Sequence, residues 1–453
     1  MKKGDIISVE AEELIYPREG LAHYQGKKIR IDQALPGQRL QVRVIRNGDK
    51  RALAKTLSVE ERAPYEKAPL CSFTHFCGGC SFPTVPYETQ VRWKGREVLE
   101  QLSKNQVQVE EFEGIQGCQR LTGYRNKMEY TFGDEEKGGR PALGMHRKGR
   151  YMDIVTVSDC VIAPADFNRI VEGTLAFFTQ RGIPFYRKKE RTGFQRNLII
   201  RRGERTGELL VNLVSTSQAS LDKKAFVDCL LALELDEEIC GITHTINDSV
   251  SDFVYCDSLE VLWGRGYYRE EILGLTFQVS PFSFFQTNTL AAERLYQEAL
   301  GMIDELEGKR VFDLYCGTGT ISQIMALKAK EVVGVEIVEE AVGSARENAA
   351  LNGLDNCRFV AADVFDALDE LKEPPDLMVL DPPRAGILPK TLSKILAYRS
   401  PQILYISCNP LTMAQNLAVM QQEGYQVMRL KAYDNFPWTK HIECCCLLQR
   451  EEA

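Results

Sequence analysis

Short apolar runs alternate with amphipathic stretches along the last third of the chain. The apolar runs cover residues 310–314, 331–335, 357–360, 377–380 and 402–406, and we interpret them as buried strands with helices between them. Two later runs, 426–432 and 442–448, have no helix between them and predict an antiparallel edge. Residues 276–453 are therefore predicted to form a doubly wound α/β domain, with ligands at the carboxyl ends of its strands.

The first 60 residues show a different pattern, with short strands and frequent turn residues. Strands are predicted at 5–10, 14–16, 28–31, 40–45 and 51–57, and Gly20, Gly26, Pro36-Gly37 and Asn47-Gly48 separate them. Five short strands fit a small OB-like barrel, a fold that often binds single-stranded nucleic acid. Between the two ends, residues 61–275 predict an α+β domain with a helix at 87–104 and strands at 197–201, 208–214 and 241–247. The fold class is thus multidomain α/β.

Composition excludes several classes of protein. The chain has 453 residues, 44% of them hydrophobic, and it contains no apolar run of 18 residues that could span a membrane. Its first residues form no apolar core of a signal peptide. We therefore expect a cytoplasmic protein, working as a monomer. In that compartment the 14 cysteines predict metal ligands, catalytic thiols or core residues rather than disulfides.

Taken alone, the net charge of −7 disfavours a polyanionic partner, but the charges are unevenly distributed. Lys and Arg exceed Asp and Glu by five in residues 1–55, by four in 120–150 and by six in 187–205, which leaves −22 for the rest. One basic segment is usually a solvated surface. Three of them on an acidic body predict a face that binds RNA.

Cys71, Cys77 and Cys80 stand close together around a Gly-Gly pair and predict part of a metal site. Cys160 is the expected fourth ligand, and Cys118 competes with it. Four thiolates suit either structural zinc or a 4Fe–4S cluster, and the spacing leaves both open.

A Gly-x-Gly turn at Gly317 follows the first predicted strand of the α/β domain, and acids end the next two strands at Glu336 and Asp363. The two acids occupy corresponding positions at the ends of neighbouring strands, and together they favour a site for a nucleoside cofactor. Each acid taken alone could be only a helix cap. NAD competes with S-adenosylmethionine (SAM). The tight turn without a third glycine, and Asp381-Pro-Pro-Arg after the fourth strand, favour SAM. Gln286 is a further candidate SAM contact, because no structural role is evident for it.

Cys408 lies where the fifth predicted strand ends and a helix begins. Asn409 can cap that helix, Pro410 suits its first turn, and Gly424 stops it. The positive end of the helix is expected to favour the thiolate, although buried, inert cysteines are common. A methyltransferase needs such a thiolate to methylate an unreactive carbon, such as C5 of a pyrimidine.

That chemistry also needs a base to remove the proton from C5. Glu443 begins the last predicted strand, and neighbouring strands can place it on the same rim as Cys408. A surface charge at a strand start is the ordinary alternative.

Taken together, the sequence resembles the bacterial RNA uracil-5-methyltransferases, specifically the 23S rRNA branch with a TRAM domain and an iron–sulfur cluster. The matching motifs include the turns around Gly20 and Pro36, the four cysteines 71, 77, 80 and 160, Gly123-Tyr-Arg-Asn-Lys127, Gln286-Thr-Asn288, Asp381-Pro-Pro-Arg-Ala-Gly386, Ser407-Cys-Asn-Pro410 and His441-Ile-Glu443.

The resemblance implies a 4Fe–4S cluster rather than zinc, and a TRAM barrel over residues 1–60. It implies SAM contacts at Gln286, Tyr315, Glu336 and Asp381, with Cys408 as nucleophile and Glu443 as base. The target would be a flipped-out uridine in a single-stranded or loop segment of 23S rRNA. Three alternatives stay open: the tRNA branch, an RNA cytosine-5-methyltransferase, and a non-catalytic RNA-binding protein that senses redox state.

Overall fold

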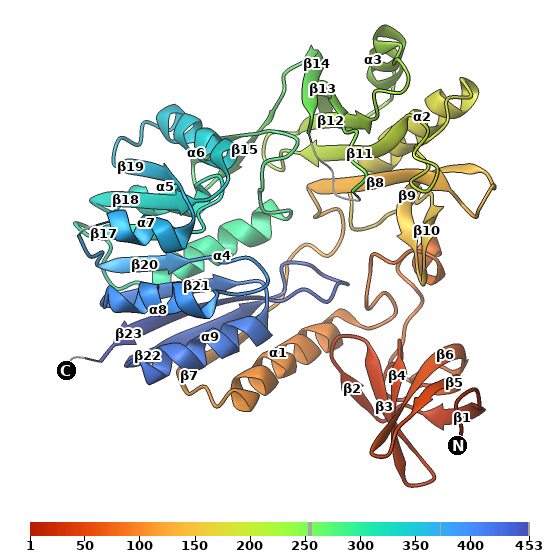
Figure 1. Cartoon of the computed structure of the whole chain (residues 1–453), viewed down its shortest axis with the longest axis horizontal. Coiled ribbons are helices and arrows are strands. Elements are labelled where there is room, and N and C mark those ends of the chain that lie inside the picture. Colours follow the sequence, from red (N-terminus) through yellow and green to blue (C-terminus); the bar gives the residue numbers. More distant parts are fainter. Residues whose placement is uncertain (252–255, 372, 452–453) are drawn as a thin grey trace. The chain divides into compact units, whose positions relative to one another are not determined.

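A computed structural model describes residues 1–251, 256–371 and 373–451 (Figure 1). The chain divides into two compact units. The first comprises Met1–Leu70, Cys80–Glu97 and Trp438–Lys440, and the second comprises Cys71–Gly79, Val98–Pro437 and His441–Ala453. Within the described ranges, no helix is both long and apolar enough to cross a membrane.

The first unit contains a six-stranded sheet in the order β1-β5-β6-β4-β3-β2. The strands are β1 (Ile6–Glu10), β2 (Glu13–Ile15), β3 (Glu19–Tyr24), β4 (Lys27–Asp32), β5 (Arg39–Asn47) and β6 (Arg51–Glu61). The sheet curls so that β1 also lies close to β3, which fits a small barrel. The prediction of five strands was wrong because Gly20 lies within β3 rather than in a turn. A Cβ on Gly20 would meet the Ala34 Cβ at 2.7 Å, so tight packing explains this glycine.

The predicted helix at 87–104 is confirmed as α1 (Tyr87–Lys104). In the first unit its Trp93 ring packs edge-on against the rings of Tyr65 and Phe82, with centroids 5.9 and 5.8 Å away. These aromatic contacts anchor the start of the helix.

The second unit has a central seven-stranded sheet in the order β10-β9-β8-β11-β12-β13-β14. Its strands are β8 (Lys127–Asp134), β9 (Pro141–Arg147), β10 (Arg150–Val155), β11 (Gln195–Arg202), β12 (Glu208–Ser215), β13 (Glu238–Ile246) and β14 (Ser258–Gly264). The three strands predicted in this segment are confirmed as β11, β12 and β13. Helices α2 (Ala165–Gln180) and α3 (Lys223–Leu231) share one hydrophobic core with the sheet.

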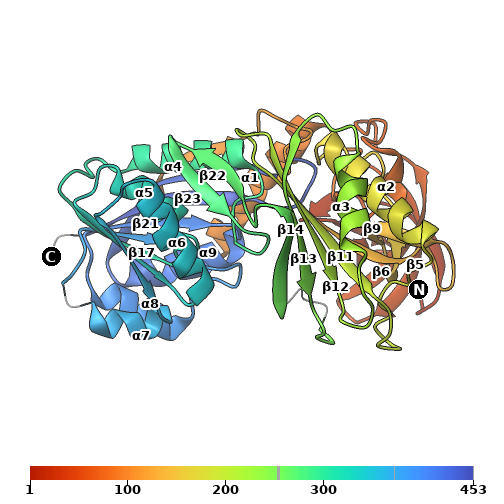
Figure 2. The same cartoon turned by 90° about the horizontal axis from the view of Figure 1, so that it is seen from above.

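The C-terminal part of the second unit is an eight-stranded sheet in the order β19-β18-β17-β20-β21-β23-β22-β7, with helices on both faces (Figure 2). Its strands are β7 (Val109–Gln116), β17 (Arg310–Leu314), β18 (Glu331–Glu336), β19 (Cys357–Ala361), β20 (Leu377–Leu380), β21 (Gln402–Ser407), β22 (Tyr425–Tyr433) and β23 (Glu443–Arg450). Its helices are α4 (Thr289–Met302), α5 (Thr320–Ala326), α6 (Glu339–Leu351), α7 (Val364–Glu370), α8 (Pro389–Ala397) and α9 (Pro410–Gln422). A hairpin of β15 (Tyr268–Ile272) and β16 (Leu275–Val279) packs into the same core.

All seven strands predicted after residue 276 for this sheet are confirmed, but their edge is not where the sequence predicted it. β23 pairs antiparallel with both β21 and β22, whereas β7, about 300 residues earlier, pairs parallel with β22 and forms the outer strand. The strand order reverses between β17 and β20. Ligands of doubly wound sheets bind at such a reversal, beyond the carboxyl ends of the strands.

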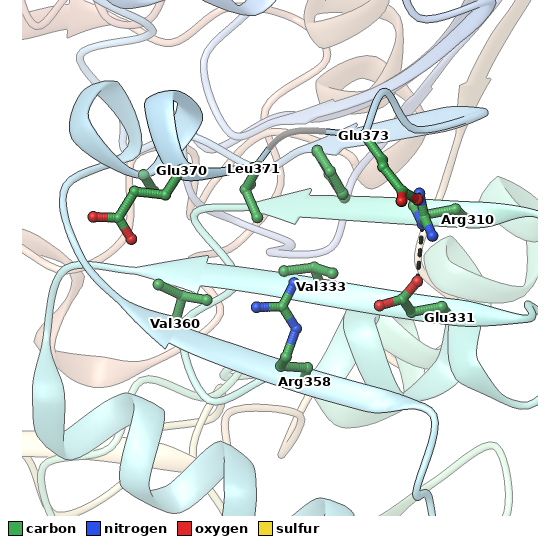
Figure 3. A pocket seen from close by; sticks show the side chains of 10 residues that line it. Arg310, Glu331, Val333, Arg358, Val360, Glu370, Leu371 and Glu373 are labelled. Carbon is green, nitrogen blue, oxygen red and sulfur yellow. Dashed lines mark hydrogen bonds and ion pairs between the residues drawn. The ribbon is translucent and has the colours of Figure 1, made fainter.

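A pocket of about 370 Å³ lies at the other end of the strands (Figure 3). Phe312, Val333 and Val360 line it, and α7 contributes Ala367. Arg310 at its rim is paired with Glu331 at 2.8 Å. None of its lining residues belongs to the site described next, so the two are separate.

Candidate active site

The turn after β17 has an unusual backbone. Tyr315 has a φ of +69°, and its N–H and that of Cys316 both donate to the Val335 carbonyl, at 2.9 and 3.0 Å. Gly317 and Gly319 follow with φ of +54° and +74°, and Gly319 precedes the first residue of α5. A left-handed tyrosine is strained, and such strain collects at ligand sites.

The predicted register of the acids is present. Glu336, the last residue of β18, accepts the Gly317 N–H through Oε2 at 3.1 Å, so the acid is fixed against the glycine turn. Asp363, by contrast, is exposed and accepts the Phe365 N–H at 2.8 Å as the cap of α7. The helix-cap alternative therefore accounts for the observed hydrogen bond of Asp363.

Two further carboxyl groups lie on the adjacent strands β17 and β20. Asp313 is fully buried, with Oδ2 accepting from Ser322 and Oδ1 without a hydrogen-bond partner. Burial raises the pKa of Asp381 to about 7, and the neighbouring charge of Asp313 adds to the effect. Burial and the charge of Glu336 raise the pKa of Asp313 in turn, so this cluster of acids is suited to a positively charged ligand.

The turn that carries Cys408 is built as the sequence predicts. Asn409 caps α9 by accepting the Leu411 N–H at 3.2 Å, and Pro410 occupies the first turn. The Asn409 amide also donates to the Arg384 carbonyl at 2.9 Å. The cap therefore ties the thiol-bearing turn to the Asp-Pro-Pro-Arg loop after β20.

Strand register brings Cys408 and Glu443 together. β21 and β23 are antiparallel, with Ser407 opposite Cys444, so the next residue of one strand faces the preceding residue of the other. Those residues are Cys408, which is half-buried, and Glu443, which is 6% exposed. The predicted placement on one rim is confirmed.

The expectation that the helix would favour the thiolate was wrong for the protein alone. Burial raises the pKa of the Cys408 thiol to about 11, and the charges of Glu443 and Asp381 raise it further than Arg384 lowers it. Two carboxylates and the loss of water outweigh the helix dipole. In the protein alone, Cys408 is therefore a protonated thiol at neutral pH.

Tyr296 of α4 is a site residue that sequence reasoning missed. It is buried, its hydroxyl is hydrogen-bonded to the side chain of Gln286, and it feels the charges of Asp381 and Glu443. Burial raises its pKa, so the phenol stays protonated. Its helical position among apolar residues gave no signal of this contact.

Comparison with known proteins agrees with this geometry. Residues 273–451 match the family described as tRNA (Uracil-5-)-methyltransferase. An uncharacterized RNA methyltransferase of Clostridium tetani is 43% identical to this chain, over 100% of this chain and 99% of the relative. Another, of Caldanaerobacter subterraneus, is also 43% identical, over 99% of this chain and 100% of the relative. The chain belongs to the RNA uracil-5-methyltransferase family. A crystal structure of the Pyrococcus abyssi tRNA (uracil-54, C5)-methyltransferase with S-adenosyl-L-homocysteine shares the fold, with a TM-score of 0.78 at 24% identity over 98% of this chain and 100% of that one.

This family uses SAM, and the residues present fit that ligand. A Cβ on Gly317, in the turn after β17, would meet only the Phe284 ring, at 3.9 Å, and Glu336 lies beside this turn with acceptor capacity on both oxygens. Asp381 offers a negative charge next to it. Gln286, Tyr315, Glu336 and Asp381 would hold SAM.

A buried polar network holds the loop that carries Gln286 in this methyltransferase. Arg201 of β11, 1% exposed, donates to the carbonyls of Pro281 and Ser283. Asn126 donates to the Gln286 carbonyl at 2.9 Å and to the Thr289 hydroxyl at 2.8 Å. The central sheet thus fixes the backbone of a candidate SAM contact, through partners that are far apart in the sequence.

Three of the predicted cysteine ligands, Cys71, Cys77 and Cys160, lie in the second unit. Ser72 donates to Asp159 at 2.9 Å, which brings the segments of Cys71 and Cys160 together. Burial raises the pKa of Cys160, and the nearby thiols of Cys77 and Cys71 add to the effect. Cys80 lies in the first unit.

The side chains of the described residues do not gather into a set of metal ligands. Among residues 1–251, 256–371 and 373–451, no three His, Cys, Asp or Glu side chains are close enough to hold an ion. Cys118, the competing ligand, instead accepts from Asn288 at 3.6 Å. The thiols are near one another without forming a completed site.

Proposed function

We propose that this enzyme methylates C5 of specific uridines in 23S rRNA through a covalent bond between Cys408 and C6. The observation that supports it most is the pairing of β21 with β23, which brings a thiol and a buried carboxyl group together beside Asp381. A purely structural cysteine gains nothing from two acidic neighbours that oppose its ionisation. A nucleophile that must form and then release an adduct needs a base beside it.

The mechanism follows from these positions. Bound SAM supplies an activated methyl group and a positive charge. Cys408, after releasing its proton to solvent, would add as a thiolate to C6 of a flipped-out uridine, and the electron pair would move to C5. C5 would then take the methyl group that SAM supplies, leaving S-adenosylhomocysteine. Glu443 then removes the proton from C5. The electrons of that C–H bond re-form the C5–C6 double bond, the S–C6 bond breaks, and the thiolate leaves.

The ionisation of Cys408 fits this order of events. A pKa of about 11 keeps the thiol protonated at neutral pH, so the site is unreactive without its ligands. A positive charge beside Asp381 would offset the carboxylates that raise this pKa. Arg384 already acts in that direction.

The remaining parts of the chain are assigned to RNA and to the cluster. We assign RNA binding to the barrel of residues 1–60 and to residues 61–275, and catalysis to 276–453, in a cytoplasmic monomer. Cys71, Cys77, Cys80 and Cys160 are proposed to hold a 4Fe–4S cluster, which is supported by the proximity of three of these thiols in the second unit. No catalytic step depends on the cluster.

A tRNA target is the second candidate, because the matching family model and the solved structure with this fold are both named for tRNA. The test incubates unmodified 23S rRNA and unmodified tRNA with SAM and either the wild-type enzyme or Cys408→Ser, and then maps 5-methyluridine. We expect it in 23S rRNA with the wild type only. 5-methyluridine confined to tRNA would establish the second candidate, and 5-methylcytidine would overturn both.

A further inference from the structure

Three segments of the second unit form a surface outside the catalytic sheet. The hairpin of β9 and β10 carries His146 and Tyr151, one on each strand, the cysteine loop carries Phe76, and the segment before β11 carries Lys188. The Lys148 N–H donates to the Phe76 carbonyl at 2.7 Å, and the Gly78 N–H donates to the His146 carbonyl at 3.2 Å. These backbone bonds fix the cysteine loop to the edge of the hairpin.

Large side chains on this surface face solvent. Tyr151 is 53% exposed, Met152 is 52% exposed and Phe76 is 46% exposed. The register between β9 and β10 shifts between Arg150 and Ile154, and Tyr151 and Met152 lie in that irregular stretch. Because such irregularities redirect side chains away from the regular pleat, they account for this exposure.

The aromatic rings are held in position. The His146 and Tyr151 rings stack with centroids 4.1 Å apart and planes 11° apart. The His146 Nδ1–H donates to the Tyr151 carbonyl at 2.6 Å, which fixes the imidazole behind the phenol. Lys188 Nζ lies 5.3 Å from the Tyr151 centroid, and the Arg147 guanidinium lies 5.0 Å from that of Phe76. Exposed rings and cations therefore alternate.

The charge of this surface is strongly positive. Lys188 joins two segments that are separate in the sequence, since its ammonium lies over the ring of the hairpin's Tyr151. Residues 146–151 contain three cations and no acid, and residues 187–191 contain four cations and one acid. The cations are Arg147, Lys148, Arg150, Arg187, Lys188, Lys189 and Arg191. Two of them are paired with acids outside these segments, Arg150 with Asp153 at 3.4 Å and Arg187 with Asp134 at 3.6 Å, and an excess of positive charge remains.

We propose that this surface binds a single-stranded segment of the substrate RNA, with phosphates on the surrounding cations. His146 covers one face of Tyr151, so an unpaired base would stack on the face that Lys188 now covers, and the lysine would move to a phosphate. An aromatic ring can stack on a base of any sequence, and positively charged side chains around the ring can bind the phosphates of the strand. A duplex keeps its bases stacked internally, so it cannot use the ring. The inference rests on the proposed function in that the bound strand belongs to the RNA that is methylated.

The test measures the affinity of the full-length enzyme for a fluorescein-labelled oligouridine of about 15 nucleotides, by anisotropy at fixed salt. Tyr151→Ala should weaken binding roughly 5- to 150-fold, the range found when a base-stacking aromatic is removed. Tyr151→Phe keeps the ring and should bind as the wild type does. Leu351→Ala removes a 50% exposed apolar side chain from α6, outside the RNA-binding residues, and should have no effect.

Two further measurements separate stacking from general attraction. Lys188→Gln should lower the slope of log affinity against log salt by about 0.7. Annealing the probe to oligoadenosine should make binding independent of Tyr151. If Tyr151→Ala and the wild type bind the single strand with equal affinity, the proposal that this surface binds RNA is overturned.

The same preparations distinguish this inference from the proposed function. If the wild type forms 5-methyluridine and Tyr151→Ala binds oligouridine normally, RNA binding by this surface is refuted and the proposed methylation is supported. If the Tyr151 dependence holds but no 5-methyluridine forms, the surface stands and the proposed reaction fails.

Discussion

The raised pKa of Cys408 makes a prediction about chemical reactivity without substrates. With a pKa of about 11, roughly 0.1% of this thiol is ionised at pH 8, against about a quarter of an ordinary cysteine with a pKa near 8.5. Because only the thiolate is alkylated, iodoacetamide should modify Cys408 more than 100-fold more slowly than a free cysteine peptide. The rate should rise about tenfold per pH unit from pH 8 to pH 10.

The carboxylates should account for part of this shift. A like charge at close range is worth about one pKa unit or more, so Glu443→Gln should speed alkylation of Cys408 roughly tenfold at pH 8. Glu208→Gln, which removes a carboxylate paired with Arg265 in the central sheet, is the matched control and should change nothing. Peptide-resolved mass spectrometry gives the rate for this cysteine among the 14. Rapid modification of wild-type Cys408 at pH 7, or no response to Glu443→Gln, would refute the reasoning.

Three other predictions concern the scaffold and the cluster. Gly319→Ala should lower the free energy of unfolding by about 2–4 kcal/mol in a urea titration, because the φ of Gly319 is +74° and a Cβ would lie 2.6 Å from the Phe359 ring. The control is Gly343→Ala, in the open middle of α6, which should be neutral or slightly stabilising. Arg201→Lys cannot reproduce both hydrogen bonds to the loop that carries Gln286. Calorimetry should therefore show that the affinity for SAM falls about tenfold or more, which is the cost of one lost buried hydrogen bond. An unchanged affinity would show that this network does not support SAM binding. Anaerobically purified enzyme should contain about four irons per chain and little zinc, and Cys77→Ala should lose the iron; stoichiometric zinc would contradict the cluster.

Much of the catalytic half could be predicted because its signals are local. Each strand of the parallel sheet is a short apolar run, and the cap of α9 is a single residue, Asn409, at the expected place. The meeting of Cys408 and Glu443 was also predictable, since the last strand had to pair near the fifth one. These inferences need only the order of elements and the alternation of a strand.

What the sequence did not reveal depends on partners far apart in the chain. β7 closes the edge of a sheet whose other strands lie about 200 to 300 residues later. Tyr296 and Arg201 have ordinary neighbours in sequence, and only the fold brings them to Gln286 and its loop. The pKa of Cys408 had the wrong predicted direction because the helix dipole is visible in the sequence, whereas burial and two carboxylates are not.

The central claim is that Cys408 bonds to the base and Glu443 frees it. The most direct measurement incubates Glu443→Gln with SAM and substrate RNA and examines the products on a denaturing gel. A neutral amide cannot take the C5 proton, so a covalent enzyme–RNA adduct should accumulate and survive denaturation. The Cys408→Ser, Glu443→Gln double variant should form none. Normal release of 5-methyluridine by Glu443→Gln, with no adduct, would contradict the account.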